Sequence, residues 1–179
     1  MVHPVDRVCT KDKRDTSLVK KPVFTIDLED WNHGLHIFSR GHTSLPSVWW
    51  LQYKLNQYGV KAIFYVLEKF DDEVPGMVKS LESEGHIIKS HGINHFRHEK
   101  ADRQPYSWLG PTGGFYMRIL PYWLWKFFVK LYGMAYVHPH DLDEDHPKLS
   151  NPLMNWKRHV GLKTARAKVE RLLKELSWQ

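Results

Sequence analysis

The sequence predicts an α/β fold with a parallel sheet, and three observations support this prediction. Short runs rich in β-branched and aromatic residues are typical of buried strands, and they occur at residues 22–27, 61–67 and 86–90. Segments with helical spacing of apolar residues separate these runs, and Gly59 and Gly85 stand where the helices should end. The alternation of strand and helix implies parallel strands joined by right-handed crossovers.

The first half of the chain contains two predicted helices. We expect the first over residues 45–58, because a Leu-Pro-Ser start is followed by large apolar side chains at helical spacing. Residues 28–44, which precede it, show no clear period and are expected to form a loop. The second helix is expected to be capped by Asp71 or Asp72.

The second half is predicted to contain two helices and one short strand. Residues 91–114 are rich in polar residues, Gly and Pro and are expected to form a loop. A helix is predicted over 120–131, and a short strand at 135–137 leads into the sequence His-Pro-His. The polar segment 141–155 is expected to form another loop, and residues 160–178 a strongly amphipathic helix.

Length and composition indicate one ordinary globular domain. The chain has 179 residues, of which 42% are hydrophobic and 26% charged. Residues 1–21 are polar and unpatterned, so we expect a flexible leader followed by a single domain at 22–179. Cys9 is the one cysteine, which excludes an internal disulfide bond. The leader has no apolar region typical of a signal peptide, and we therefore expect a cytoplasmic protein.

The formal charge of +6 favours contact with acidic partners such as anionic glycans or a membrane surface. The positive charge is spread along the chain without a nucleic-acid-binding motif, so we expect no nucleic acid partner. The most apolar segment, residues 119–136, is interrupted by Lys126, Lys130 and Gly133 and is expected to be a buried or interfacial helix. Together these features suggest peripheral membrane contact.

Three groups of polar side chains directly follow predicted parallel strands. The carboxyl ends of parallel strands meet at one edge of the sheet, where α/β proteins build their sites. Two histidines and a carboxylate can hold a divalent metal ion and leave positions open for water and substrate. A second carboxylate can then act as general base and another histidine as general acid. The groups are Asp27, Glu29 and Asp30 after the first strand, His91 and His95 after the third, and His138 and His140 after the late strand.

Several segments resemble one protein family. Residues 24–31 (FTIDLEDW) and 85–95 (GHIIKSHGINH) are similar to the motifs S/T-x-D-x-E-D-W and G-H-E-I-x-S-H-x-x-x-H of the polysaccharide deacetylases (carbohydrate esterase family 4, NodB-homology fold). Residues 55–67 resemble a strand of that family, and 113–122 and 136–140 resemble the late part of the same branch. The resemblance extends from about residue 22 to 176, and the second motif is its most specific part.

The resemblance implies a distorted (β/α) barrel that hydrolyses N-acetyl, and sometimes O-acetyl, groups on glycans. Typical members place many more residues between the second motif and the late Gly-Gly-x-x-x-Arg segment than this chain has between His95 and Gly113. At least one strand–helix unit is therefore expected to be absent, which leaves an incomplete or open barrel. Pairing with another chain is one way to cover the resulting edge.

The resemblance also implies roles for individual residues. The metal-binding aspartate of the family falls on Glu29 or Asp30, with Asp30 preferred, and the expected ion is Zn²⁺, with Co²⁺ or a similar ion as the alternative. The sugar is expected to stack on aromatic rings. The implied assignments are Asp27 as catalytic base, His91 and His95 as metal-binding histidines, His138 as general acid, Arg103 as the arginine that orients the base with Arg118 as the fallback, and Trp31, Tyr106 and Trp108 as substrate-binding residues.

The sequence therefore predicts a metal-dependent hydrolase that removes acetyl groups from a polysaccharide or a sugar intermediate. Two alternatives remain open at this point. One is a carbohydrate-binding relative that keeps the fold without turnover, and the other is a related hydrolase of different non-peptide C–N bonds. The glycan itself is not specified by the sequence.

Overall fold

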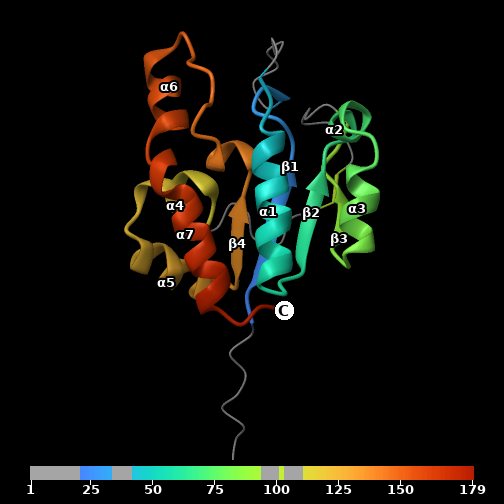
Figure 1. The fold of residues 1–179 in the computed structure, drawn as a ribbon. Coiled ribbons are helices and arrows are strands. Elements are labelled where there is room, and N and C mark those ends of the chain that lie inside the picture. Colours follow the sequence, from blue (N-terminus) through green and yellow to red (C-terminus); the bar gives the residue numbers. More distant parts are fainter. Residues whose placement is uncertain (1–20, 34–41, 94–100, 103–110) are drawn as a thin grey trace, which may run out of the picture.

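The structure is a computed structural model that describes residues 21–33, 42–93, 101–102 and 111–179. Its centre is a four-stranded parallel sheet in the order β3–β2–β1–β4 (Figure 1). The strands are β1 (Val23–Leu28), β2 (Ala62–Val66), β3 (Ile87–Ser90) and β4 (Met134–Val137). The α/β fold with a parallel sheet is thereby confirmed, and it is consistent with the NodB type. Within the described residues, the sheet is open, with β3 and β4 at its edges.

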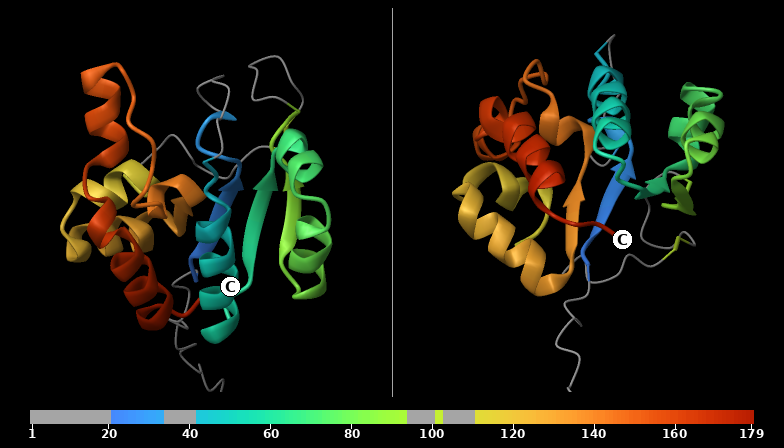
Figure 2. Two further views of the ribbon diagram at one scale, coloured as in Figure 1. Left: turned by 45° about the horizontal axis from the view of Figure 1, so that its top comes forward. Right: turned by 60° about the horizontal axis from the view of Figure 1, so that its bottom comes forward.

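Helices connect the strands as right-handed crossover topology requires and pack against the sheet (Figures 1 and 2). Figure 1 shows α1 in front of the sheet, with α3 to one side and α7 to the other. The helical elements are α1 (Leu45–Gln57), α2 (Glu68–Glu73), α3 (Met77–Ser83), α4 (Gly114–Ile119), α5 (Tyr122–Tyr132), the 3₁₀ helix η2 (Pro139–Leu142), α6 (Pro152–His159) and α7 (Leu162–Glu175).

Alternate residues of each strand enter a common hydrophobic core. On β1 these residues are Phe24, Ile26 and Leu28, all of which are fully buried. They pack with apolar side chains from the neighbouring strands and from α1, α3, α4, α5 and α7. Because side chains alternate between the two faces of a strand, the residues between them must lie on the opposite face.

The opposite face of the sheet carries polar side chains. Thr25 and Asp27 lie there on β1, Tyr65 on β2 and Tyr136 on β4. The strand register places Asp27 beside Tyr65, and it places Thr25 beside Tyr136. Thr25, Asp27 and Tyr65 are buried and Tyr136 is partly buried. Buried polar groups must be hydrogen-bonded to be stable, and the contacts of this set define the site described below.

The structure corrects the prediction of a helix capped by Asp71 or Asp72. Both aspartates lie inside α2, which starts directly after β2, and a second helix, α3, begins only after Gly76. The interruption has a local cause, because Pro75 cannot continue a helix and Gly76 adopts a left-handed conformation with φ of 89°.

Two predicted loops also contain helices. Residue 114, the last of the loop expected at 91–114, is the first residue of α4. The loop expected at 141–155 contains the start of α6, where the Asn151 side chain accepts a hydrogen bond from the Met154 N–H and Pro152 occupies the first turn. The final helix begins at Leu162 rather than residue 160, because Gly161 is left-handed with φ of 74°.

Two further predictions concern the chain as a whole. Residues 1–20 of the expected leader lie outside the described residues, so the boundary near residue 21 stays a prediction. Within the described part of the chain, no helix is long and apolar enough to cross a membrane.

Candidate active site

Four polar side chains come together where β1, β3 and β4 end, on the face of the sheet opposite the core. Asp27 Oδ2 lies 3.4 Å from His91 Nε2 and 3.8 Å from His138 Nε2. Glu29 Oε1 also lies 3.8 Å from His138 Nε2. β1 ends between Asp27 and Glu29 in a tight turn, in which the Glu29 N–H donates a hydrogen bond of 3.1 Å to the Asp27 carbonyl oxygen, and both carboxylates lie near His138. Both carboxylates are buried, with exposures of 2% and 3%.

The Tyr136 hydroxyl connects the predicted base to the predicted acid. It lies 2.8 Å from Asp27 Oδ2, to which it donates a hydrogen bond, and 2.8 Å from His138 Nε2. The hydroxyl can then accept a hydrogen bond from His138 Nε2 when the imidazole is protonated. Burial, followed by the charge of Asp27, raises the pKa of Tyr136 well above 10, so the phenol keeps its proton at neutral pH.

The other side of the His138 ring is held by Asp141. Asp141 Oδ2 lies 2.9 Å from His138 Nδ1 and also accepts a hydrogen bond of 3.0 Å from the His138 backbone N–H. Asp141 Oδ1 in turn lies 3.2 Å from Nε of Arg118, which is 5% exposed. The Arg118 guanidinium also donates to the carbonyl oxygens of Arg158 and Val160. These contacts fix the orientation of the imidazole and leave its Nε2 directed at Asp27 and Tyr136.

The surroundings of His138 favour its protonated form. Burial alone would lower the pKa of His138, but the hydrogen bond and charge of Asp141, together with Glu29 and Asp27, outweigh burial and raise the pKa to about 9. Burial would likewise raise the pKa of Asp141, but the hydrogen bond with His138 and the nearby cationic groups hold it far below its usual value. At neutral pH the site therefore contains an imidazolium paired with a carboxylate.

Two adjacent glycines make room for these side chains. A Cβ atom added at Gly114 would lie 1.7 Å from Asp141 Oδ2, and one added at Gly113 would lie 2.9 Å from the Tyr136 ring. Any larger residue at either position would displace a member of the site. The Gly-Gly pair at the start of α4 therefore has a steric role in placing Asp141 and Tyr136.

Two of the residues predicted to bind metal lie at the same edge of the sheet as the predicted base. His91 Nε2 lies 3.4 Å from Asp27 Oδ2, and Glu29 Oε1 lies 3.8 Å from His138 Nε2. Carboxylate and imidazole groups are suitable ligands for a divalent ion such as Zn²⁺. His95, the second predicted histidine ligand, lies outside the described residues.

Asp30 is directed away from this face. Its Oδ1 accepts hydrogen bonds from the backbone N–H groups of Trp31, at 2.7 Å, and Ser44, at 2.8 Å. These bonds connect the end of β1 to the residue that precedes α1. The structure thus places Glu29 beside His138 and places Asp30 in the connection to α1.

A second set of potential metal ligands lies next to the first. The donor atoms of His138, His140 and Asp141 lie within 4.8 Å of one another, and the His138 and His140 rings stack at 4.6 Å. Asp141, however, already accepts hydrogen bonds from His138 and pairs with the guanidinium of Arg118. The adjacent positive charge opposes a cation at this position, so these contacts fit a hydrogen-bonded relay better than a metal centre.

The predicted substrate-binding aromatic Trp31 is buried, with 6% exposure. Its indole N–H donates to the His42 carbonyl oxygen, and its ring packs edge-on against His146 at 5.3 Å. This placement leaves little of the ring accessible to a sugar. The predicted residues Arg103, Tyr106 and Trp108 lie outside the described residues, and Arg118 is directed at Asp141.

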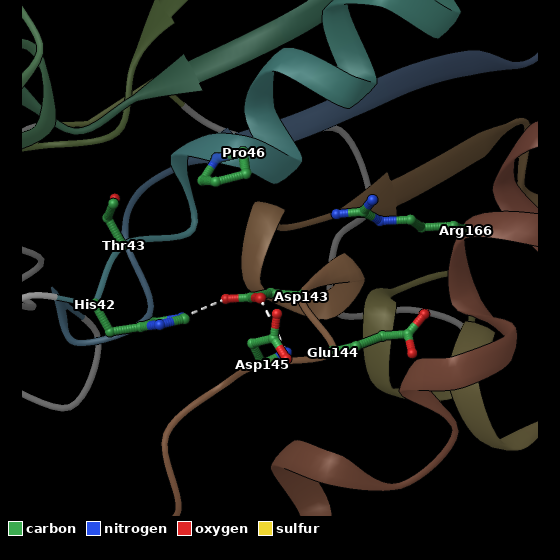
Figure 3. Close-up of a pocket in the computed structure, with 7 residues that line it drawn as sticks. All are labelled: His42, Thr43, Pro46, Asp143, Glu144, Asp145 and Arg166. Atoms are coloured by element: carbon green, nitrogen blue, oxygen red, sulfur yellow. Dashed lines mark hydrogen bonds and ion pairs between the residues drawn. The ribbon is translucent and has the colours of Figure 1, made fainter.

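A separate pocket lies on the α1 side of the same end of the sheet (Figure 3). Its volume is about 500 Å³, and the residues that line it are His42, Thr43, Pro46, Asp143, Glu144, Asp145 and Arg166. Figure 3 shows His42 directed at Asp143, and His42 Nε2 lies 2.6 Å from Asp143 Oδ2. Ser44 Oγ also approaches Asp143 at 3.4 Å. These contacts attach the loop after β1 to the segment after η2.

Sequence reasoning assigned no role to three residues at the site, namely Tyr136, Asp141 and Arg158. Tyr136 stands two residues before His138, and that spacing in a strand was a usable signal because it predicts a shared face. Asp141 follows His138 by three residues, as a side chain in the same turn would. Arg158 gave no local signal, since it lies far along the chain on α6, and its charge interacts with those of Asp141 and Glu29. Its Nη1 atom is buried and has no hydrogen-bond partner among the described residues.

Two family models match this chain. Residues 49–107 match the model described as "Polysaccharide deacetylase", and residues 105–179 match a "Domain of unknown function (DUF3473)". No curated protein and no solved structure matched the chain.

The first match makes residues 49–107 similar to polysaccharide deacetylases, and the α/β fold with its parallel sheet is consistent with that family. His91 and His95 lie in the first matched segment, and His138 lies in the second. Asp27 and Glu29 precede both segments. Their assignment therefore depends on the resemblance of the first motif and on the geometry of the site.

Proposed function

We propose that this protein is a metal-dependent deacetylase that removes an acetyl group, in the first instance an N-acetyl group, from a glycan or a sugar intermediate. The observation that supports this most strongly is the partly buried, hydrogen-bonded chain from Asp27 through Tyr136 to His138. Such a chain places a carboxylate base and an imidazolium acid on the same face at the carboxyl edge of a parallel sheet.

In this proposal Glu29, His91 and His95 hold the divalent ion. Glu29 is preferred to Asp30 because it lies beside His138, whereas an oxygen of Asp30 is engaged by two backbone N–H groups. A bound ion would act as a Lewis acid on the acetyl carbonyl and lower the pKa of a coordinated water. Zn²⁺ is the expected ion, with Co²⁺ as the alternative.

The protein's own residues perform the proton transfers. Asp27 accepts a proton from the attacking water, and His138 Nε2 donates a proton to the leaving nitrogen. Asp141 holds the other ring nitrogen and so fixes the tautomer and orientation of His138. After turnover, Tyr136 can pass a proton from Asp27 to His138, because its hydroxyl contacts both groups. This transfer restores a carboxylate base and an imidazolium acid for the next cycle.

The test is acetate release from N-acetylglucosamine oligosaccharides in the presence of Zn²⁺ or Co²⁺. Asp27→Asn and His138→Gln should each reduce turnover by about 10²–10⁴-fold, the usual contribution of general acid–base catalysis. Asp72→Asn, which changes an exposed carboxylate on α2, serves as the matched control and should retain activity. A parallel assay with an O-acetyl ester distinguishes amide from ester hydrolysis.

Two results would contradict the proposal. Unchanged turnover in both site variants would remove Asp27 and His138 from the mechanism. Glycan binding by the wild type without acetate release, in the presence of either metal, would instead support a carbohydrate-binding relative without catalysis.

A further inference from the structure

The helix α6 turns its apolar side chains toward the outside of the domain, which is the reverse of the usual arrangement. None of its residues is buried, and its large apolar side chains are the exposed ones, with exposures of 61% for Leu153, 40% for Met154 and 54% for Trp156. Surface helices normally turn their apolar side toward the protein core. An apolar side that faces outward over two turns indicates an apolar environment outside the domain.

Polar side chains of α6 face the protein instead. His159 Nε2 lies 2.8 Å from the His146 carbonyl oxygen, and Asn155 Oδ1 accepts a hydrogen bond from the Leu149 N–H. The Arg158 carbonyl oxygen accepts a bond from the Arg118 guanidinium. These contacts fix the rotation of α6 about its axis, so the outward direction of its apolar residues follows from specific bonds.

The segment of sequence that contains α6 is rich in cationic residues. Residues 148–169 contain six lysines and arginines and no acidic residue. Of these, Lys148, Lys157 and Lys163 are exposed. Glu170 follows this segment directly, and the acidic residues 143–145 precede it and line the pocket with Arg166 (Figure 3). A helix with Trp and Leu on one side and cationic residues around it has the composition of an interfacial helix on an anionic bilayer.

We infer that α6 is a membrane-docking helix, which places Leu153, Met154 and Trp156 in the interfacial region of a bilayer that contains anionic lipids. The flanking lysines lie at the level of the lipid phosphates. This inference goes beyond the proposed deacetylase activity and does not depend on it. Figure 1 shows α6 extending beyond the carboxyl ends of the strands, so docking would turn the edge with Asp27 and His138 toward the membrane surface.

A second exposed apolar surface provides a matched control. On α5, Trp123, Phe127 and Leu131 are spaced four residues apart and are more than half exposed. This helix lies at the opposite end of the molecule (Figure 1). One of its lysines, Lys126, is neutralised by Glu175 at 2.7 Å. The sequence suggested membrane contact through residues 119–136, and the two helices can be tested separately.

The experiment is flotation of the full chain with phosphatidylcholine vesicles, with and without about a third of phosphatidylglycerol. Wild type should float with the anionic vesicles and at least about tenfold less with the neutral ones. The double variant Leu153→Gln/Trp156→Gln should lose at least about tenfold in partitioning, and Lys157→Gln about fivefold. Trp123→Gln/Phe127→Gln should float like wild type. All altered side chains are exposed, so circular dichroism should show native folding in each variant.

Three outcomes would overturn the inference. The first is absence of wild-type binding to the anionic vesicles at low salt. The second is loss of binding in the α5 variant with retention in the α6 variant. The third is a wild-type dimer in solution that becomes a monomer in the α6 variant, which would identify this surface as a contact between two copies of the chain. Acetate release in the proposed assay uses a soluble oligosaccharide, so failure of either proposal is distinguishable from failure of the other.

Discussion

The ion pair of His138 with Asp141 should make the free energy of unfolding fall as the pH rises into the alkaline range. The pKa of His138 is raised from 6.5 in the unfolded chain to about 9 in the folded protein. Between these values the folded state binds more protons than the unfolded state. The stabilisation is therefore fully present below pH 6.5 and is lost as the pH rises through 9. A difference of 2.5 pKa units corresponds to about 3 kcal/mol of unfolding free energy.

The assay is urea unfolding from pH 6.5 to 10, with chelator present, for wild type and for His138→Gln. Other groups also titrate in this range, but they do so in both proteins. The difference between the two curves therefore isolates His138. Wild type should lose about 3 kcal/mol more than the variant across the range. Histidine NMR signals followed over the same pH values report the pKa of His138 directly.

The pH range below 6.5 provides an internal comparison, because there the free energy of unfolding should fall as the pH decreases. Burial lowers the pKa of His146 to about 4, so its contribution is present above pH 6.5 and lost as the pH falls toward 4. The two histidines together predict maximal stability near pH 6.5. Equal alkaline losses in wild type and His138→Gln, or a measured His138 pKa below 7, would refute the electrostatic reasoning.

Three further predictions concern single residues of the site. Tyr136→Phe should lower kcat by about 10- to 100-fold with little change in KM or metal content, because it removes the bridge between acid and base; an unchanged kcat would contradict that role. Glu29→Gln should lose bound zinc by elemental analysis and Asp30→Asn should retain it, and the reverse result would restore Asp30 as ligand. Gly114→Ala should lower the unfolding free energy by about 3–5 kcal/mol in urea titrations, since its Cβ would displace Asp141 from its buried ion pair; native stability would show that Asp141 can move freely.

The central sheet was predictable because its strands depend on short local patterns. The runs at 22–27, 61–67 and 86–90 are rich in β-branched and aromatic residues. Alternate members of the first two runs are buried core residues of β1 and β2, and Ile88 of β3 packs against this core. The edge where Asp27, His91 and His138 meet was predictable for the same reason, because parallel strands end on the same side.

The errors in secondary structure have local causes that composition obscured. Segment 141–155 is polar and contains proline, which favours a loop, yet Asn151 and Pro152 form a helix start within it. The sequence of α6 also lacks the apolar stripe of a helix that packs on a core, because this helix turns polar groups toward the protein. The Pro75-Gly76 pair was a visible break signal, and it divides the second helix in two.

The relay around His138 required information that no single segment contains. Asp141 reaches His138 locally, but its second partner, Arg118, comes from α4, and the space for its carboxylate exists because Gly114 lacks a Cβ. The sequence showed the Gly-Gly-x-x-x-Arg segment only as part of a resemblance, with the arginine as a fallback for orienting the base. In the structure, the glycine and the arginine of this segment contact the same carboxylate. The segment therefore acts on the predicted acid through Asp141, because Gly114 and Arg118 stand four residues apart and so lie on the same side of α4.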